Sequence, residues 1–106
     1  MTENKNEDLQ EMQMLDQSLH NLLLQKQAFQ MELSETKSGL VEIEKSGEIF
    51  KLVGELMIKV GKEKVKEELL SKEKVLNMRV KSIEKQEDSI AKRLEELRNK
   101  FSKLTK

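Results

Sequence analysis

His20 is the only histidine in this chain, and imidazole is the side chain best suited to proton transfer or metal binding near neutral pH. Either role needs other ionisable or ligating side chains that converge on the ring, and the sequence indicates none for His20. Leu19 belongs to an apolar helical stripe, so His20, one position further, falls on the solvent side. We therefore interpret His20 as a surface residue without a chemical role.

Gly61 and Lys62 invite comparison with a phosphate-binding loop, in which a glycine-rich turn and a lysine surround the phosphates. The preceding glycine, Gly54, stands at the wrong spacing, and Glu63 occupies the place where a serine or threonine would bind magnesium. The many glutamates are interspersed with lysines, which is typical of solvated helix surfaces. We therefore expect no enzyme activity, no catalytic residue, no cofactor and no metal site.

The composition of the 106 residues favours long helices over a packed globule. Charged residues make up 38% of the chain and aromatic residues 3%, while proline, tryptophan, tyrosine and cysteine are absent. The 20 basic and 20 acidic residues are interspersed, so we expect neither a nucleic-acid partner nor a membrane-surface helix. No apolar run approaches the ~20 residues that span a bilayer, and the polar start of the chain does not resemble a secretory signal.

Two apolar stripes with alternating steps of three and four residues predict two long helices, at about residues 8–46 and 62–104. The first stripe consists of Met12, Leu15, Leu19, Leu22, Lys26, Phe29, Leu33, Thr36, Leu40 and Ile43. The second consists of Leu69, Glu73, Leu76, Val80, Ile83, Glu87, Ile90, Leu94, Leu97, Phe101 and Leu104. We call these two stripes the seam. Its polar members include Lys26 and Glu87, which would fall in adjacent layers with opposite charge.

Residues 49–60, "IFKLVGELMIKV", predict two strands joined by a tight type II′ turn at Gly54–Glu55. Such a hairpin reverses the chain and makes the flanking helices antiparallel. In a symmetric hairpin, paired residues have numbers that sum to 109, as in Val53 with Leu56. The same sum pairs Met12 with Leu97 and Leu33 with Leu76 in the helices, so the local signals agree on one register.

The predicted hairpin is apolar on both faces, because only Lys51 and Lys59 interrupt its two strands. One face carries Ile49, Val53, Leu56, Ile58 and Val60, and the other carries Phe50, Leu52 and Met57. A two-stranded ribbon of this kind is marginal in water, and both of its edges are open to pairing. We therefore expect the hairpins of several chains to assemble into one closed sheet, which makes the protein an obligate oligomer.

The chain resembles the prefoldin β subunit of the archaeal type. Three stretches carry the likeness: "QKQAFQMELSETKSGLVEIEK" (residues 25–45), "FKLVGELMIK" (residues 50–59) and "NMRVKSIEKQEDSIAKRLEEL" (residues 77–97). The hairpin and the Glu-Lys-Gln-Glu segment are the specific parts, since apolar heptads match any coiled coil. The resemblance implies a mainly α fold in which two long helices form an antiparallel intramolecular coiled coil around one central β-hairpin, with residues 1–106 as a single domain.

The resemblance also implies an ATP-independent, cytoplasmic chaperone subunit. Prefoldins are hexamers of two α and four β subunits whose hairpins form a common body, and the ends of their coiled coils hold unfolded polypeptides and pass them to a group II chaperonin. By this likeness the working surface lies at the free ends of the two helices. The expected client-binding residues are Leu9, Met12, Met14, Leu15, Leu97, Phe101 and Leu104. Flexible methionines and leucines suit partners without a fixed shape.

An alternative of another class is a passive coiled-coil tether or oligomerisation module without clients. In that case isolated exposed apolar residues such as Leu23, Leu24 and Met31 would have no function, since single apolar side chains are common on protein surfaces. Both alternatives require the hairpin to assemble, so the mass of the oligomer cannot separate them. Suppression of client aggregation can.

Overall fold

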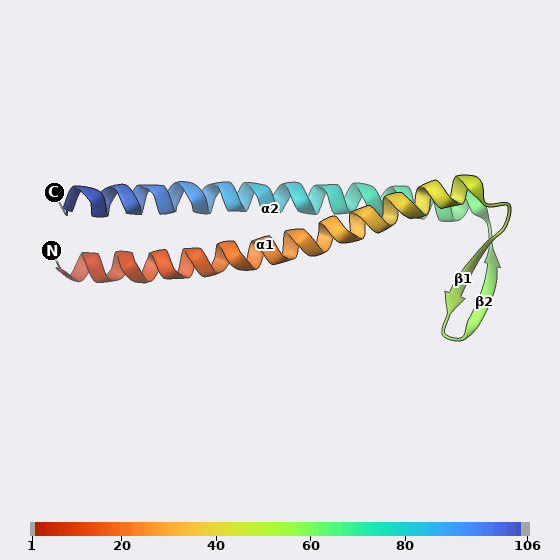
Figure 1. The fold of residues 1–106 in the computed structure, drawn as a ribbon, viewed down its shortest axis with the longest axis horizontal. Coiled ribbons are helices and arrows are strands. Elements are labelled where there is room, and N and C mark those ends of the chain that lie inside the picture. Colours follow the sequence, from red (N-terminus) through yellow and green to blue (C-terminus); the bar gives the residue numbers. More distant parts are fainter. Residues whose placement is uncertain (1, 105–106) are drawn as a thin grey trace. The chain divides into compact units, whose positions relative to one another are not determined.

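The computed structural model describes residues 2–104, with the side chains of residues 5–103, and it contains two helices separated by a hairpin (Figure 1). The order is α1 (Thr2–Lys45), β1 (Ile49–Val53), β2 (Leu56–Val60) and α2 (Lys62–Leu104). This is the mainly α arrangement that the periodicity predicts. Helix α1 begins before residue 8, its expected start, because residues 2–7 contain no proline or glycine to prevent helix formation.

The chain groups into two compact units. The terminal unit consists of residues 1–27 and 81–106, and the hairpin unit consists of residues 28–80. Two ion pairs show that the helices of the terminal unit are antiparallel: Asp8, near the start of α1, pairs with Lys100 at 2.8 Å, and Lys26, further along α1, pairs with Glu87 at 2.8 Å. Within the hairpin unit, the same pairing brings Arg79 of α2 over the ring of Phe29 of α1, 5.5 Å from its centroid.

The predicted seam is confirmed as the packed core of both units. Every seam residue from Met12 to Phe101 is buried or half-buried. The apolar residues with the least exposure are Ile43, Leu76, Ile83, Leu94 and Leu97. A seven-residue repeat keeps these side chains on one side of each helix, so both helices bury the same stripe along their lengths. Two long helices with so narrow a core leave most other side chains exposed.

Three polar residues of the seam, Lys26, Thr36 and Glu87, have hydrogen-bond partners. Lys26 Nζ donates to Glu87 Oε1, and the two side chains are 20% and 18% exposed. Thr36, only 3% exposed, donates its hydroxyl to the carbonyl of Glu32 at 2.8 Å, within its own helix and not across the seam. Among the described residues, no buried side-chain nitrogen or oxygen lacks a hydrogen-bond partner. The core therefore accepts these groups without an unpaired polar atom.

The hairpin has the register that the symmetric pairing predicts. Ile49 pairs with Val60 and Val53 pairs with Leu56, so that strands β1 and β2 form a two-stranded antiparallel sheet (Figure 1). Gly54 has a φ of 61°, and Glu55 is not in the positive-φ region. This combination fits a type II′ turn, in which only the first central residue needs a positive φ.

Candidate functional site

The hairpin is the most exposed apolar surface of the hairpin unit. Leu52 and Met57 are each 70% exposed, and Leu56 is 68% exposed. Among the other predicted assembly residues, Phe50, Val53 and Ile58 are about half exposed (47%, 50% and 46%), and Ile49 and Val60 are half-buried at the base of the strands. Leu52 and Met57 are directly paired on one face, and Val53 and Leu56 are paired on the other.

Both faces and both outer edges of this ribbon are therefore uncovered within the chain. Each strand has a single neighbour in the described sheet, which leaves one row of backbone groups per strand without a strand partner. Apolar patches of this kind on a small protein mark sites of association, because water contact with them is unfavourable. A second layer of strands would cover the faces, and further strands would pair the edges.

The hairpin is attached to its helices by polar contacts. Lys62 Nζ donates to the carbonyl of Ser46 at 3.1 Å, and Lys66 lies 2.6 Å from the carboxylate of Glu44. The hydrogen bond from Lys66 lowers the pKa of Glu44, and the same bond raises the pKa of Lys66. These contacts join the end of α1 to the start of α2, on either side of the strands.

The terminal unit carries a second set of exposed apolar side chains, close to the start of α1. Met14 is 69% exposed and Leu9 is 45% exposed, whereas Met12 and Leu15 are half-buried in the seam. The predicted client-binding residues therefore differ in how much of each side chain is exposed. The two off-seam residues offer surface, and the seam residues support the helix pair beneath them.

The α2 members of that predicted set differ in the same way. Leu97 is 1% exposed, so it joins the helices and offers no surface of its own. Phe101 is half-buried, so only part of its ring offers surface. Leu104 is the last residue of α2, and its side chain lies outside the described residues. The exposed part of the predicted site is therefore Leu9 and Met14, with Phe101 partly accessible.

An arginine fastens the helices beside these residues. Arg93 Nε donates to Glu11 Oε2 at 2.9 Å and its Nη2 donates to Glu11 Oε1 at 2.8 Å, a bidentate pair. The hydrogen bonds from Arg93 lower the pKa of Glu11, and bonds to Glu11 and Glu96 raise the pKa of Arg93. The guanidinium fixes the relative orientation of two helix surfaces more specifically than a lysine would.

A groove in the terminal unit contains the histidine that the sequence alone places on a bare surface. His20 is exposed, as expected, but it lines this groove together with Asp16, Leu19, Leu23 and Glu87. Asp16, Leu19, His20 and Leu23 lie on two successive turns of α1, and Glu87 comes from α2. Periodicity could have indicated this arrangement, because Asp16 and Leu23 occupy the heptad position that flanks the seam.

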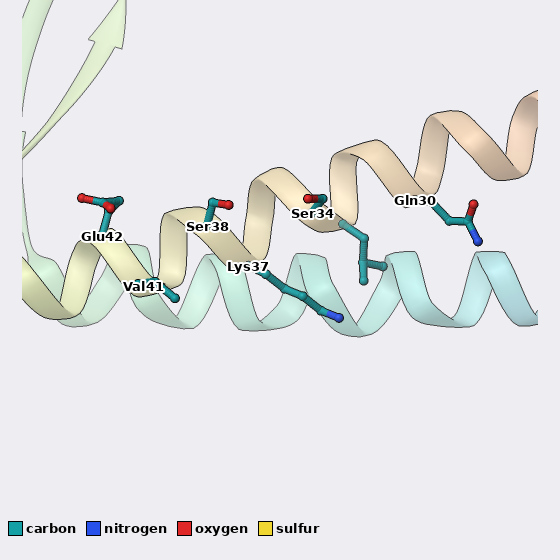
Figure 2. Close-up of a pocket in the computed structure, with 7 residues that line it drawn as sticks. Gln30, Ser34, Lys37, Ser38, Val41 and Glu42 are labelled. Carbon is teal, nitrogen blue, oxygen red and sulfur yellow. The ribbon is translucent and has the colours of Figure 1, made fainter.

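A larger depression lies in the hairpin unit, and all of its lining comes from one helix. Its lining consists of Gln30, Leu33, Ser34, Lys37, Ser38, Val41 and Glu42. Figure 2 labels all of these residues except Leu33, spaced along α1. Because no second element contributes a side chain, the depression is an open surface and not an enclosed site. Its mixed apolar, hydroxyl and charged lining does not define one kind of ligand.

The described residues contain no group of three or more histidine, cysteine, aspartate or glutamate side chains that could hold a metal ion. Neither α1 nor α2 has, within the described residues, an apolar stretch sufficient to cross a membrane. The candidate functional features are therefore two apolar surfaces, one on the hairpin and one on the terminal unit.

Comparisons with known proteins agree on one family. A profile described as "Prefoldin subunit" matches residues 6–106. The chain is 42% identical over 88 residues to the prefoldin subunit beta of Thermococcus onnurineus, covering 80% of this chain and 76% of that protein. It is 37% identical over 96 residues to the prefoldin subunit beta of Pyrococcus furiosus, covering 88% and 82%. The crystal structure of the prefoldin beta subunit from Thermococcus strain KS-1 is similar with a TM-score of 0.86 at 32% identity, covering 93% of this chain and 90% of that one.

Proposed function

This chain belongs to the prefoldin subunit family, and we propose that it acts as a β-type subunit of an ATP-independent chaperone that holds unfolded polypeptides. The family is one of chaperone subunits, and its β members form hetero-oligomers with α subunits. The observation that carries the proposal is the exposure of Leu9 and Met14 beside a well-packed seam.

Assembly through the hairpin is the first part of the proposal. The exposed pairs Leu52–Met57 and Val53–Leu56 would lie inside a sheet formed with an α-type subunit and with further copies of this chain. An α2β4 hexamer is the expected stoichiometry. Burial of these side chains removes apolar surface from water at about 25 cal/mol per Å², a stabilisation that the isolated ribbon lacks.

Client binding at the terminal unit is the second part. Leu9 and Met14 are exposed on α1, and Glu11, which lies between them in the sequence, is held by Arg93, so α1 is joined to α2 close to both residues. Methionine and leucine side chains adapt to varied apolar partners, which suits unfolded chains. Each contact is weak, and several copies in one complex would bind one client with a combined avidity.

Delivery is the third part. The bound client would pass to a group II chaperonin in the cytoplasm, without nucleotide consumption by this chain. A transfer assay tests this step, with labelled client released from the complex on addition of the chaperonin. Release that is equal with and without chaperonin would contradict delivery while leaving client binding intact.

The deciding experiment measures aggregation of a thermally unfolding client in the presence of the complex of this chain with an α-type subunit. A Leu9→Ser/Met14→Ser variant should lose most of the protection. Val75→Ser/Met78→Ser is the matched control, because Val75 (45%) and Met78 (63%) are similarly exposed but lie in the hairpin unit. Sedimentation should show intact complexes for both variants.

Two outcomes would count against the proposed function. If the parent complex does not protect the client, the chain is a passive coiled-coil module. If the Leu9→Ser/Met14→Ser complex protects as well as the parent complex does, the client-binding surface lies elsewhere on the chain.

A further inference from the structure

The groove that contains His20 combines an apolar floor with an acidic rim. Leu19 and Leu23 supply the apolar part, and Leu23 is 40% exposed. Asp16 from α1 and Glu87 from α2 supply the carboxylates, and the groove has a volume of about 370 Å³. Such a space accepts one long side chain at its apolar floor and leaves the tip of that side chain beside the carboxylates.

The charge around this groove is negative. Asp16 is exposed and has no ion pair among the described residues. Lys26 is the cation that neutralises Glu87, and the charge of Glu84 also acts on the Lys26 ammonium. One lysine therefore faces two glutamates, and Asp16 adds a third carboxylate, which forms no ion pair among the described residues.

Two cations near the end of α2 are engaged elsewhere. Arg93 bonds Glu11, which flanks the seam on the side opposite to Asp16 in the heptad, and Lys100 bonds Asp8. Residues 6–25 of α1 contain four carboxylates and no lysine or arginine. This stretch of α1 therefore carries a negative charge of its own.

A regular row passes through the groove. Leu9, Asp16 and Leu23 occupy the same heptad position, so they follow one another along α1 at intervals of about 10 Å. All three are exposed. A peptide in the polyproline II conformation has three residues per turn and rises about 3.1 Å per residue, so every third residue points to the same side and meets the next member of this row.

We propose that this row selects cationic client segments, in which a lysine or arginine stands three residues from an apolar residue on each side. The proposal rests on the proposed client binding and names the chemistry that the site prefers. The aliphatic stem of the cation lies on Leu19 and Leu23, and its head reaches Asp16. The flanking apolar residues of the client contact Leu9 and Leu23.

The experiment uses the complex of this chain with an α-type subunit and measures binding of fluorescent peptides by anisotropy. The peptides have the pattern Leu-x-x-Arg-x-x-Leu in a glycine–serine background, with glutamine or glutamate in place of arginine in two others. A fourth peptide moves the arginine next to one leucine. We expect the centred arginine peptide to bind about fivefold more tightly than the glutamate peptide at low salt. Added salt should reduce this preference, because it screens exposed charges.

The Asp16→Asn variant should bring the arginine and glutamate peptides to nearly equal affinity. Glu7→Gln is the matched control, since Glu7 is an exposed carboxylate on the same helix at an outward heptad position, and it should keep the preference. Helix content and complex mass should be unchanged in both variants.

Equal binding of the arginine and glutamate peptides would overturn the charge selection and leave client binding intact. An unchanged preference in Asp16→Asn would overturn the role of this groove. If the peptide with the shifted arginine binds as tightly as the peptide with the centred arginine, the three-residue spacing is wrong. Failure of every peptide to bind, together with a lack of client protection, would overturn the selection along with the proposed function itself.

Discussion

The ammonium of Lys26 donates a hydrogen bond of 2.8 Å to the carboxylate of Glu87, from one helix to the other, at two seam positions that are otherwise reserved for apolar side chains. The hydrogen bond to Glu87 raises the pKa of Lys26, so the lysine stays charged across the physiological range. A half-buried pair of this kind specifies register, because any shift of one helix along the other leaves both charges without a partner.

Reversal of one charge tests this role. Lys26→Glu places two carboxylates together and should lower the thermal midpoint by several degrees, and Glu87→Lys alone should do the same. The double variant Lys26→Glu/Glu87→Lys should recover part of the loss. Circular dichroism melts at fixed protein concentration give the coupling energy, and a coupling of zero would contradict the register role.

The bidentate Arg93–Glu11 pair predicts a dependence of stability on pH. The pKa of Glu11 is lowered in the folded chain from an ordinary value of 4.5. Its contribution is therefore present above pH 4.5 and is lost as the pH falls through the folded pKa. Below pH 4.5, the thermal midpoint of Glu11→Gln should decrease less steeply with falling pH than the thermal midpoint of the parent. Glu95→Gln is the control, because the exposed Glu95 has no ion pair among the described residues. An identical acid profile for parent and Glu11→Gln would contradict the prediction.

A charge on the hairpin should prevent assembly. Ile58→Asp places a carboxylate in the expected multi-chain sheet, where an unpaired buried charge costs several kcal/mol. The variant should sediment as a smaller species and keep most of its helical circular dichroism. Val75→Asp is the control, since Val75 (45%) and Ile58 (46%) are equally exposed within the chain. A complex of unchanged mass for Ile58→Asp would argue against a body built from hairpins.

Two glycines should respond to alanine with opposite signs. Gly39 lies inside α1, and a Cβ added there would be 3.5 Å from Leu69 Cδ1, an ordinary contact. Gly39→Ala should therefore stabilise the chain by about 0.5–1 kcal/mol. Gly54 has a positive φ, so Gly54→Ala should destabilise the hairpin by about 1–2 kcal/mol. Thermal unfolding of the two variants checks both signs, and a destabilised Gly39→Ala would show that the helices cannot accept the added methyl group.

The sequence by itself determined the two helices, the hairpin and their common register. These features depend on local rules: a seven-residue apolar repeat selects one side of a helix, and a glycine at the first turn position selects the pairing of Val53 with Leu56. The burial of the seam from Met12 onward follows from the same repeat. The Lys26–Glu87 pair could be predicted because both residues break the repeat in adjacent layers.

Only the tertiary structure decided which surface residues act together. Many lysines and glutamates could have paired across the helices, and long flexible side chains leave that choice to contacts that periodicity does not encode; Arg93 with Glu11 is the outcome. His20 and Asp16 line one groove with Glu87 because the opposite helix supplies its second wall; the repeat in α1 places Asp16 beside the seam but does not show that a groove forms there.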